Sequence, residues 1–327
     1  MGFQAFWVEK SDDGFNYSVV ERAESDLPAG DVLIEVSYSS LNYKDALSAT
    51  GNPGVTRNFP HTPGIDAAGK VLASDSDQFA VGDDVLVMGY DLGMNTPGGF
   101  GQRIRVPADW VVAMPAGLDA YTSMVLGTAG FTAALSVEKM LRAGLEPAQG
   151  PVLVTGASGG VGVVAIALLA KLGFEVACVT GKADRWAELE ALGAAQMLSR
   201  EEALEGADRP MLAERWAGAV DTVGGDILAN AIKATRHSGS VAACGLAASP
   251  AIPNMTVLPF ILRHVNLLGI DSVELPIEHK RALWARLGDE WALDLSAVTQ
   301  TLELTDLPSA ISSILQGGMF GRSVVRL

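Results

Sequence analysis

Residues 152–162 read Val-Leu-Val-Thr-Gly-Ala-Ser-Gly-Gly-Val-Gly, and their types and spacing could bind a dinucleotide. The glycines at 156, 159 and 162 follow a short apolar run, and an apolar helical pattern continues to Leu172. Glycines between a strand and a helix let the backbone approach a pyrophosphate at the helix N-terminus. The spacing is not the common G-x-G-x-x-G, and such a turn can simply connect two elements. The flanking strand and long helix favour the dinucleotide site.

The end of the next apolar strand, 174–179, indicates which dinucleotide binds. A site that reads a free ribose 2′-hydroxyl usually carries Asp or Glu there. Here Thr180-Gly181-Lys182 follows, with Arg185 one helical turn on and Arg200 after the next short apolar stretch. Hydroxyl, backbone amide and cationic donors suit a 2′-phosphate, so NADP is favoured over NAD. The alternative is that Lys182 and Arg185 are solvated charges at the start of a helix.

Two later strands end in segments that could also line the cofactor crevice. Residues 221–225, Asp-Thr-Val-Gly-Gly, close one strand, and Cys244-Gly245-Leu246 close the next. Because strand C-termini line this crevice in open α/β sheets, Leu246 is expected to form a wall on the nicotinamide side. An ordinary strand-end residue is the alternative.

The sequence offers few ligands for a metal ion. Its four histidines have no ligand-like spacing, and its two cysteines cannot build a four-cysteine zinc lobe. Hydride transfer without a metal needs a substrate that is already polarised, such as an alkene conjugated to a carbonyl. The pattern therefore favours alkene reduction over alcohol oxidation, and we expect no bound metal.

Composition and charge indicate the number of domains, the kind of partner and the compartment of this protein. A chain of 327 residues with 49% apolar and 19% charged residues is typical of a folded protein of two domains. Its net charge of −15 opposes binding to nucleic acid or an anionic membrane. No secretion signal is recognised, and Cys178 and Cys244 lie in apolar runs typical of buried, reduced thiols. We therefore expect a cytoplasmic protein that acts on a small molecule.

The elements that must position these residues fall into an α/β fold with two domains. Residues 1–122 are β-rich and interrupted by turns, whereas 123–270 alternate strands and helices in the pattern of a Rossmann doubly wound parallel sheet. The tail, 271–327, departs from that pattern and could complete the sheet of the first domain. Strands are expected at 3–8, 32–39, 67–72, 84–88, 104–106, 151–155, 174–179, 218–221, 239–244, 265–270, 300–304 and 323–327. Helices are expected within 123–141 and at 160–172, 183–192, 225–234, 279–287 and 307–316.

With these residues identified, the chain resembles the zinc-free medium-chain dehydrogenases/reductases of the quinone-oxidoreductase type, and more closely the NADPH-dependent acryloyl-CoA reductase branch. Segments shared across the superfamily are the glycine turn and 127–133, Gly-Thr-Ala-Gly-Phe-Thr-Ala. Narrower segments are 41–45, Leu-Asn-Tyr-Lys-Asp, and 269–273, Gly-Ile-Asp-Ser-Val. Zinc-dependent relatives have Gly-His-Glu where this chain has 64–66, Gly-Ile-Asp, and a cysteine at the position of Asn42.

The resemblance implies a GroES-like fold for the β-rich domain and a set of cofactor contacts. These contacts are Tyr43, Ser158, Gly159, Gly160, Val161, Thr180, Gly181, Lys182, Arg200, Leu246, Ile261 and Ser272. The residues themselves support the glycine turn, 180–182 and Leu246, whereas Ile261 and Ser272 depend on the family pattern.

The resemblance also implies hydride delivery from NADPH to the β-carbon of acryloyl-CoA, giving propanoyl-CoA. Tyr43 is the candidate for orienting the nicotinamide or supplying the proton, and Asp45 for positioning it. Tyr43 could instead be a packing aromatic, and Asp45 could bond local amides. Competing functions are an NADPH:quinone or general enone reductase, a non-catalytic NADPH-binding protein and an alcohol dehydrogenase. A homodimer is expected along the last Rossmann strand, 265–270.

Overall fold

The computed structural model describes residues 2–327, which form two compact units. Of the described residues, unit 1 contains 2–128 and Ser272–Leu327, and unit 2 contains Ala129–Asp271. The first division falls just after Gly127, where helix α2 (Ala120–Arg142) is interrupted by a residue with φ 51° and ψ −159°. An L-residue is strained at such a φ, so glycine permits the chain to turn there from one unit into the other.

Unit 1 is mainly β-structure. Its strands are β1 (Gly2–Ser11), β2 (Gly14–Ala23), β3 (Val32–Ser40), β4 (Asp66–Ser74), β5 (Asp84–Met88), β6 (Arg103–Val106), β7 (Val111–Ala113), β14 (Thr299–Glu303) and β15 (Arg322–Arg326). Its helices are α1 (Tyr43–Ala49), α8 (Ile277–Gly288) and α9 (Leu307–Leu315), together with the start of α2. Strands β1 and β2 form a separate hairpin.

The C-terminal tail of the chain completes the larger sheet of unit 1. The strand order is β14-β15-β3-β4-β5-β7, with β6 also paired to β3, and β15 runs antiparallel to β3 with Val325 opposite Ser39. The expectation that the tail joins this sheet is therefore confirmed. One core packs inside the sheet around Val32, Ile34 and Val85, and a second packs between Phe6, Phe100 and helix α9.

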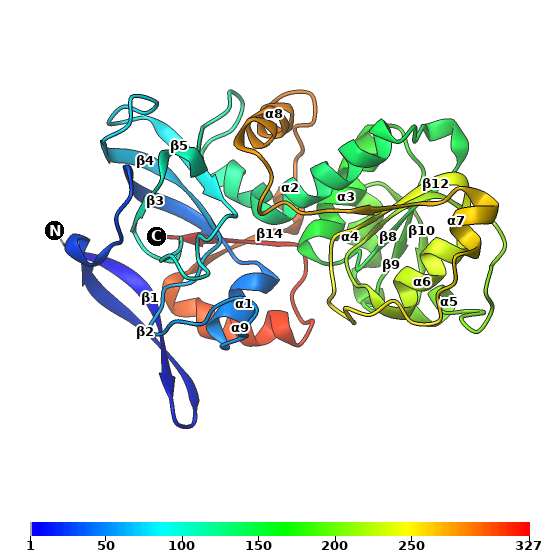
Figure 1. The fold of residues 1–327 in the computed structure, drawn as a ribbon, viewed down its shortest axis with the longest axis horizontal. Coiled ribbons are helices and arrows are strands. Elements are labelled where there is room, and N and C mark those ends of the chain that lie inside the picture. The colour runs from blue at the N-terminus through cyan, green and yellow to red at the C-terminus, as the bar shows by residue number, and fades with distance from the viewer. Residues whose placement is uncertain (1) are drawn as a thin grey trace. The chain divides into compact units, whose positions relative to one another are not determined.

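Unit 2 contains one parallel sheet of six strands, β10-β9-β8-β11-β12-β13, seen at the right of Figure 1. The strands are β8 (Val152–Thr155), β9 (Val176–Val179), β10 (Ala194–Leu198), β11 (Trp216–Asp221), β12 (Thr235–Ala243) and β13 (Asn266–Gly269). In chain order this is 3-2-1-4-5-6, the order of a Rossmann sheet, and it reverses between β8 and β11. The predicted fold class is confirmed.

The helices of unit 2 are α3 (Gly160–Lys171), α4 (Trp186–Ala191), α5 (Arg200–Ala203), α6 (Gly225–Ala234) and α7 (Leu258–Arg263), with the remainder of α2. Helix α6 packs Leu228, Ala231 and Ile232 against one face of the sheet. Right-handed crossovers put α3 and α4 on the opposite face, because the strands from β8 to β10 are added toward one edge of the sheet and those from β11 to β13 toward the other. Helix α2 is apolar and long enough to cross a membrane, but 72% of its most apolar window is buried, as in a core helix.

Several strands and helices of the structure are not among those predicted from the sequence. Hairpin strand β2 is mostly half-exposed, so its apolar pattern is weak, and β10 begins Ala-Ala-Gln, which lacks strand-forming residues. Helices α1 and α7 have only 7 and 6 residues, too short for a helical period to be recognised. The expected helix at 183–192 is a 3₁₀ turn, Ala183–Arg185, followed by α4.

Candidate functional site

The glycine turn of unit 2 connects β8 to α3 directly opposite the end of β11. Gly156 has φ +60°, and a Cβ added there would lie 2.1 Å from Oγ1 of Thr222, so both conformation and space require glycine. Gly159 is the N-cap of α3 and provides no side-chain cap. The first amides of this twelve-residue helix are therefore available to an anion, which the helix dipole also favours.

Polar groups from three segments meet at the end of β9. The buried Thr180 hydroxyl donates a hydrogen bond to Ser158 Oγ at 2.9 Å and accepts one from the Lys182 amide at 3.1 Å. A Cβ added at Gly181 would lie 2.7 Å from Arg200 Cζ, so the Arg200 guanidinium packs directly over this glycine. The structure thus brings the predicted residues of the turn, the β9 end and α5 together.

The electrostatics of this cluster suit an anion. Burial lowers the pKa of Lys182, and the positive charges of Arg185 and Arg200 lower it further against the opposing effect of Asp184. Arg185 forms ion pairs with Glu188 at 2.8 Å and Asp184 at 3.5 Å. No described carboxylate forms an ion pair with Arg200. An anionic ligand would therefore be favourable beside Lys182 and Arg200, whereas Arg185 is paired with Glu188 and Asp184.

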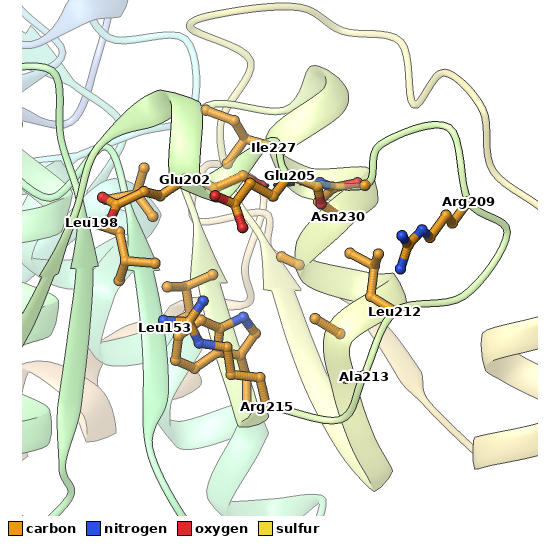
Figure 2. Close-up of a pocket in the computed structure, with 16 residues that line it drawn as sticks. Leu153, Leu198, Glu202, Glu205, Arg209, Leu212, Ala213, Arg215, Ile227 and Asn230 are labelled. Atoms are coloured by element: carbon orange, nitrogen blue, oxygen red, sulfur yellow. Dashed lines mark hydrogen bonds between the residues drawn. The ribbon is translucent and has the colours of Figure 1, made fainter.

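A cavity of about 310 Å³ opens on the α6 face of the unit 2 sheet (Figure 2). Its walls are largely apolar, with Leu153, Val179 and Leu198 contributed by adjacent strands, and Glu205 and Arg215 are among the charged side chains that line it. Val179 directly precedes Thr180, and Leu198 lies two residues before Arg200. The cavity extends from these residues to Trp216 at the start of β11 and Ala234 at the end of α6, and none of Thr180, Lys182 and Arg200 lines it.

The remaining predicted contacts are more scattered. Leu246 follows β12 and is 55% exposed, and Ile261 lies on α7 and is 65% exposed. Ser272 is buried in unit 1, just before the segment that leads into α8. Leu246 has the exposed position expected of a crevice wall. No observation in the structure assigns a cofactor contact to Ile261 or Ser272, so these two stay predictions from the family pattern.

Tyr43 and Asp45 lie together at the start of α1 in unit 1. Tyr43 is the first residue of the helix and is 37% exposed, so its side chain can meet a ligand. Asp45 is fully buried: Oδ2 accepts the Asn42 amide at 2.8 Å, and Oδ1 accepts the Ile65 amide at 2.8 Å. Asp45 therefore caps the helix that carries Tyr43 and contacts backbone rather than an open site, which makes it a positioning residue.

A buried polar network that sequence reasoning did not assign surrounds this cap. Asp66 Oδ2 accepts hydrogen bonds from Ser40 Oγ at 2.5 Å and Asn42 Nδ2 at 2.8 Å. The Thr128 backbone amide also donates to Oδ2 at 2.9 Å, and the Thr128 hydroxyl donates to Oδ1 at 2.6 Å. One signal in the sequence pointed to Asp66. Residues 64–66 read Gly-Ile-Asp where zinc-dependent relatives have Gly-His-Glu, so Asp66 occupies the position of a functional glutamate in those relatives.

Arg322 completes the charge balance of the network. It is buried, donates from Nε to the Val125 carbonyl at 2.7 Å, and burial lowers its pKa to about 10 against the opposing effect of Asp66 and Asp45. Burial raises the pKa of Asp45 to about 7, and the charge of Asp66 adds to the rise. Two carboxyl groups and one guanidinium are thus buried together, and the free energy of burying each charge depends on the charges of the other two.

The described residues 2–327 contain no cluster of three or more His, Cys, Asp or Glu side chains suited to a metal ion. His61 is buried with Nε2 against the Gly93 carbonyl at 2.9 Å, and burial lowers its pKa. Cys178 and Cys244 are free thiols whose pKa values burial raises to about 12. Cys178 is buried and Cys244 half-buried, close to the expectation of two buried, reduced cysteines.

Comparisons with known proteins agree with this geometry. Residues 28–116 match the alcohol dehydrogenase GroES-like domain, and residues 160–306 match the family model described as zinc-binding dehydrogenase. The chain is 45% identical to acrylyl-CoA reductase AcuI of Ruegeria pomeroyi, over 99% of this chain and 98% of that protein.

Two further relatives have solved structures. The yhdH oxidoreductase of Salmonella enterica, crystallised in complex with NADP, is 46% identical with a TM-score of 0.95, over 99% of each chain. YhfP of Bacillus subtilis, named a putative quinone oxidoreductase, is 42% identical over 99% of each chain. Its crystal structure with NAD bound has a TM-score of 0.96 and covers 100% of each chain. This chain therefore belongs to the medium-chain dehydrogenase/reductase family, in the quinone-oxidoreductase-like group that includes the acrylyl-CoA reductase AcuI.

Proposed function

We propose that this protein is an NADPH-dependent oxidoreductase that reduces the C=C bond of acryloyl-CoA to give propanoyl-CoA. The observation that carries the proposal is the 45% identity to a protein named acrylyl-CoA reductase over the full length of both chains. The glycine turn, the cationic β9 end and the exposed Tyr43 supply the groups that such a reaction needs.

The residues of unit 2 fit an NADP molecule. The uncapped amides of α3 would hold the pyrophosphate, and Lys182 and Arg200 would bind the 2′-phosphate with the Thr180 hydroxyl. The NADP complex of the Salmonella relative supports this choice, whereas the NAD complex of the Bacillus relative makes the cofactor preference a point to be measured.

When bound, NADPH supplies a hydride for the β-carbon of the enoyl thioester. Negative charge then develops on the thioester oxygen, and hydrogen-bond donors near that oxygen stabilise it. The Tyr43 hydroxyl donates a proton to the α-carbon, and Asp45 holds Tyr43 in place by capping α1. Since conjugation already polarises the alkene, no Lewis acid is required for these steps.

We propose that the reaction is independent of zinc. The family model that matches residues 160–306 is named for zinc, but the carboxylate oxygens of Asp66 are already engaged by Ser40, Asn42 and Thr128. A metal ion would have to displace those internal hydrogen bonds. Metal analysis of the active protein is the direct check, and stoichiometric zinc would contradict this part of the proposal.

A quinone or general enone reductase is the second candidate, favoured by the 42% identity to a putative quinone oxidoreductase. Steady-state oxidation of NADPH with acryloyl-CoA, a simple quinone, an enone and an aldehyde separates the candidates. We expect the largest kcat/KM with acryloyl-CoA. A far larger value for the quinone would overturn the CoA assignment, and tight NADPH binding without turnover of any acceptor would indicate a non-catalytic binding protein.

We also propose a cytoplasmic homodimer. Strand β13 is at the edge of the unit 2 sheet, and Leu267 on it is 40% exposed, while Val257 and Leu262 nearby in the chain exceed 60%. Pairing of two β13 strands would cover these apolar side chains and the open backbone edge. The two free thiols fit a reducing compartment. Light scattering of the wild type and of Leu267→Glu tests the dimer, which the charge is expected to dissociate.

A further inference from the structure

Asp221 is a buried carboxylate at the end of β11, where the order of the strands reverses. Neither the cofactor contacts nor the proposed proton transfer uses it. Oδ1 accepts a hydrogen bond from the Thr155 hydroxyl at 2.6 Å, and Oδ2 accepts one from the Gly224 amide at 2.7 Å. One carboxylate oxygen is therefore bonded to the end of the neighbouring strand β8, and the other to the N-cap of helix α6, which follows β11.

The Thr155 hydroxyl extends this contact into a small closed network. Its oxygen accepts a hydrogen bond from the Thr222 amide at 3.1 Å, while the Thr222 hydroxyl donates to the Thr155 carbonyl at 2.9 Å. Thr155 and Thr222 thus bond to each other twice, and Asp221 fixes the Thr155 hydroxyl as a donor toward β11. The ends of β8 and β11 are locked in one relative position.

This lock acts on the dinucleotide turn because Thr155 is the residue before Gly156. A Cβ at Gly156 would lie 2.1 Å from Thr222 Oγ1 and 2.9 Å from Val223 Cγ1, so the turn already lies directly against the locked Thr222. Asp221 also reaches the third strand end, since its carbonyl accepts the Cys244 amide at 2.9 Å. The segment that follows Cys244 carries Leu246, the expected wall of the cofactor crevice.

We infer that Asp221 and Thr155 are positioning residues for NADPH: their hydrogen bonds hold the Gly156–Gly159 turn in the conformation that presents the α3 amides to the cofactor pyrophosphate. The inference rests on the proposed function, which supplies the ligand. Neither side chain touches the cofactor itself. Removing the Thr155 hydroxyl leaves Asp221 Oδ1 and the Thr222 amide without their partner, and the turn then samples other conformations.

Thr155→Val tests this, because it removes the hydroxyl with little change of shape. We expect it to raise the NADPH dissociation constant about tenfold and to leave the KM for acryloyl-CoA near the wild-type value. Thr155→Ser keeps the hydroxyl and is expected to restore most of the affinity. Thr235→Val is the matched control, since the buried Thr235 hydroxyl donates to the Ala231 carbonyl at 2.7 Å, at the opposite end of the strands.

Thermal unfolding of all three variants separates positioning from stability. If Thr155→Val and Thr235→Val lower Tm alike but only Thr155→Val weakens NADPH binding, the inference holds. If Thr155→Val binds NADPH like the wild type, it is wrong. Asp221→Asn sets an amide N–H against either the Thr155 hydroxyl or the Gly224 amide. We expect it to lose more NADPH affinity than Thr155→Val does. If Asp221→Asn fails to fold, the Thr155 variants alone test the inference. If the wild type binds no NADPH, the proposed function is wrong, and this inference is wrong with it.

Discussion

Asn42 Nδ2 donates a hydrogen bond to Asp66 Oδ2 at 2.8 Å, inside unit 1. The contact joins the residue before α1 to the first residue of β4, 24 positions away. Both side chains are buried. Because Asn42 is also the N-cap of the helix that begins with Tyr43, the position of Tyr43 depends on the Asp66 carboxylate.

Asp66→Asn is expected to destabilise unit 1. An amide in place of the carboxylate turns one acceptor atom into a donor that faces the Asn42 amide or the Thr128 hydroxyl, and it removes the negative charge near buried Arg322. We expect a loss of about 2–4 kcal/mol in the free energy of unfolding. Denaturant unfolding measures it.

The control for Asp66→Asn is Asp84→Asn, which breaks the exposed ion pair with Lys70 at 2.7 Å. Such pairs contribute about 0–1 kcal/mol, so this variant should unfold close to the wild type. Equal stability of the two variants would contradict the view that the Asp66 network supports the fold.

Asp45 predicts a dependence of stability on pH. Burial, and then the charge of Asp66, raise its pKa from 3.8 to about 7 in the folded protein. Between these two values the folded state binds more protons than the unfolded state, so stability falls as pH rises from about 4 to about 7 and then levels off. Asp45→Asn does not titrate, and its unfolding free energy should fall less across this window. Denaturant titrations at a series of pH values give both curves, and identical slopes would exclude Asp45 as the titrating group.

The dinucleotide turn could be predicted from the sequence because its signals are local. A strand, three glycines and a helix follow one another within 152–172, and each is dictated by near neighbours. The end of β9 could be predicted for the same reason, since Thr180 and Lys182 directly follow the strand. Arg200 could be predicted because it follows the next strand of the chain, β10, whose end lies at the same edge of a parallel sheet as the end of β9.

The network around Asp66 could not be predicted because its partners are far apart in the chain. Arg322 reaches the Val125 carbonyl across 197 positions, and Thr128 reaches Asp66 across 62. Nothing in periodicity or spacing pairs such residues. The Asp221–Thr155 contact spans 66 positions and could not be predicted for the same reason, although the sequence indicates both strand ends. Register between distant strands decides these contacts, and it appears only in the fold.

Tyr43→Phe tests the proton donor. The ring remains and the hydroxyl is lost, so we expect kcat with acryloyl-CoA to fall by about 10²–10³. Tyr121→Phe is the control, because its hydroxyl meets only Thr301 Oγ1, at 3.4 Å, on the surface. Retention of more than about a third of wild-type kcat in Tyr43→Phe, far above that expected loss, would refute the donor role while leaving a cofactor contact possible.

Lys182 and Arg185 form a matched pair for testing cofactor selectivity, since they lie three positions apart but their pKa values shift in opposite directions. The hydrogen bond to Glu188 raises the pKa of Arg185, whereas burial, and then the charges of Arg185 and Arg200, lower the pKa of Lys182 against the effect of Asp184. Lys182→Ala should therefore raise the KM for NADPH about tenfold or more and leave that for NADH unchanged, because only NADPH carries the 2′-phosphate. Arg185→Ala should alter neither value. Equal loss of NADPH affinity in both variants would mean that general positive potential, rather than a phosphate contact at Lys182, determines selectivity.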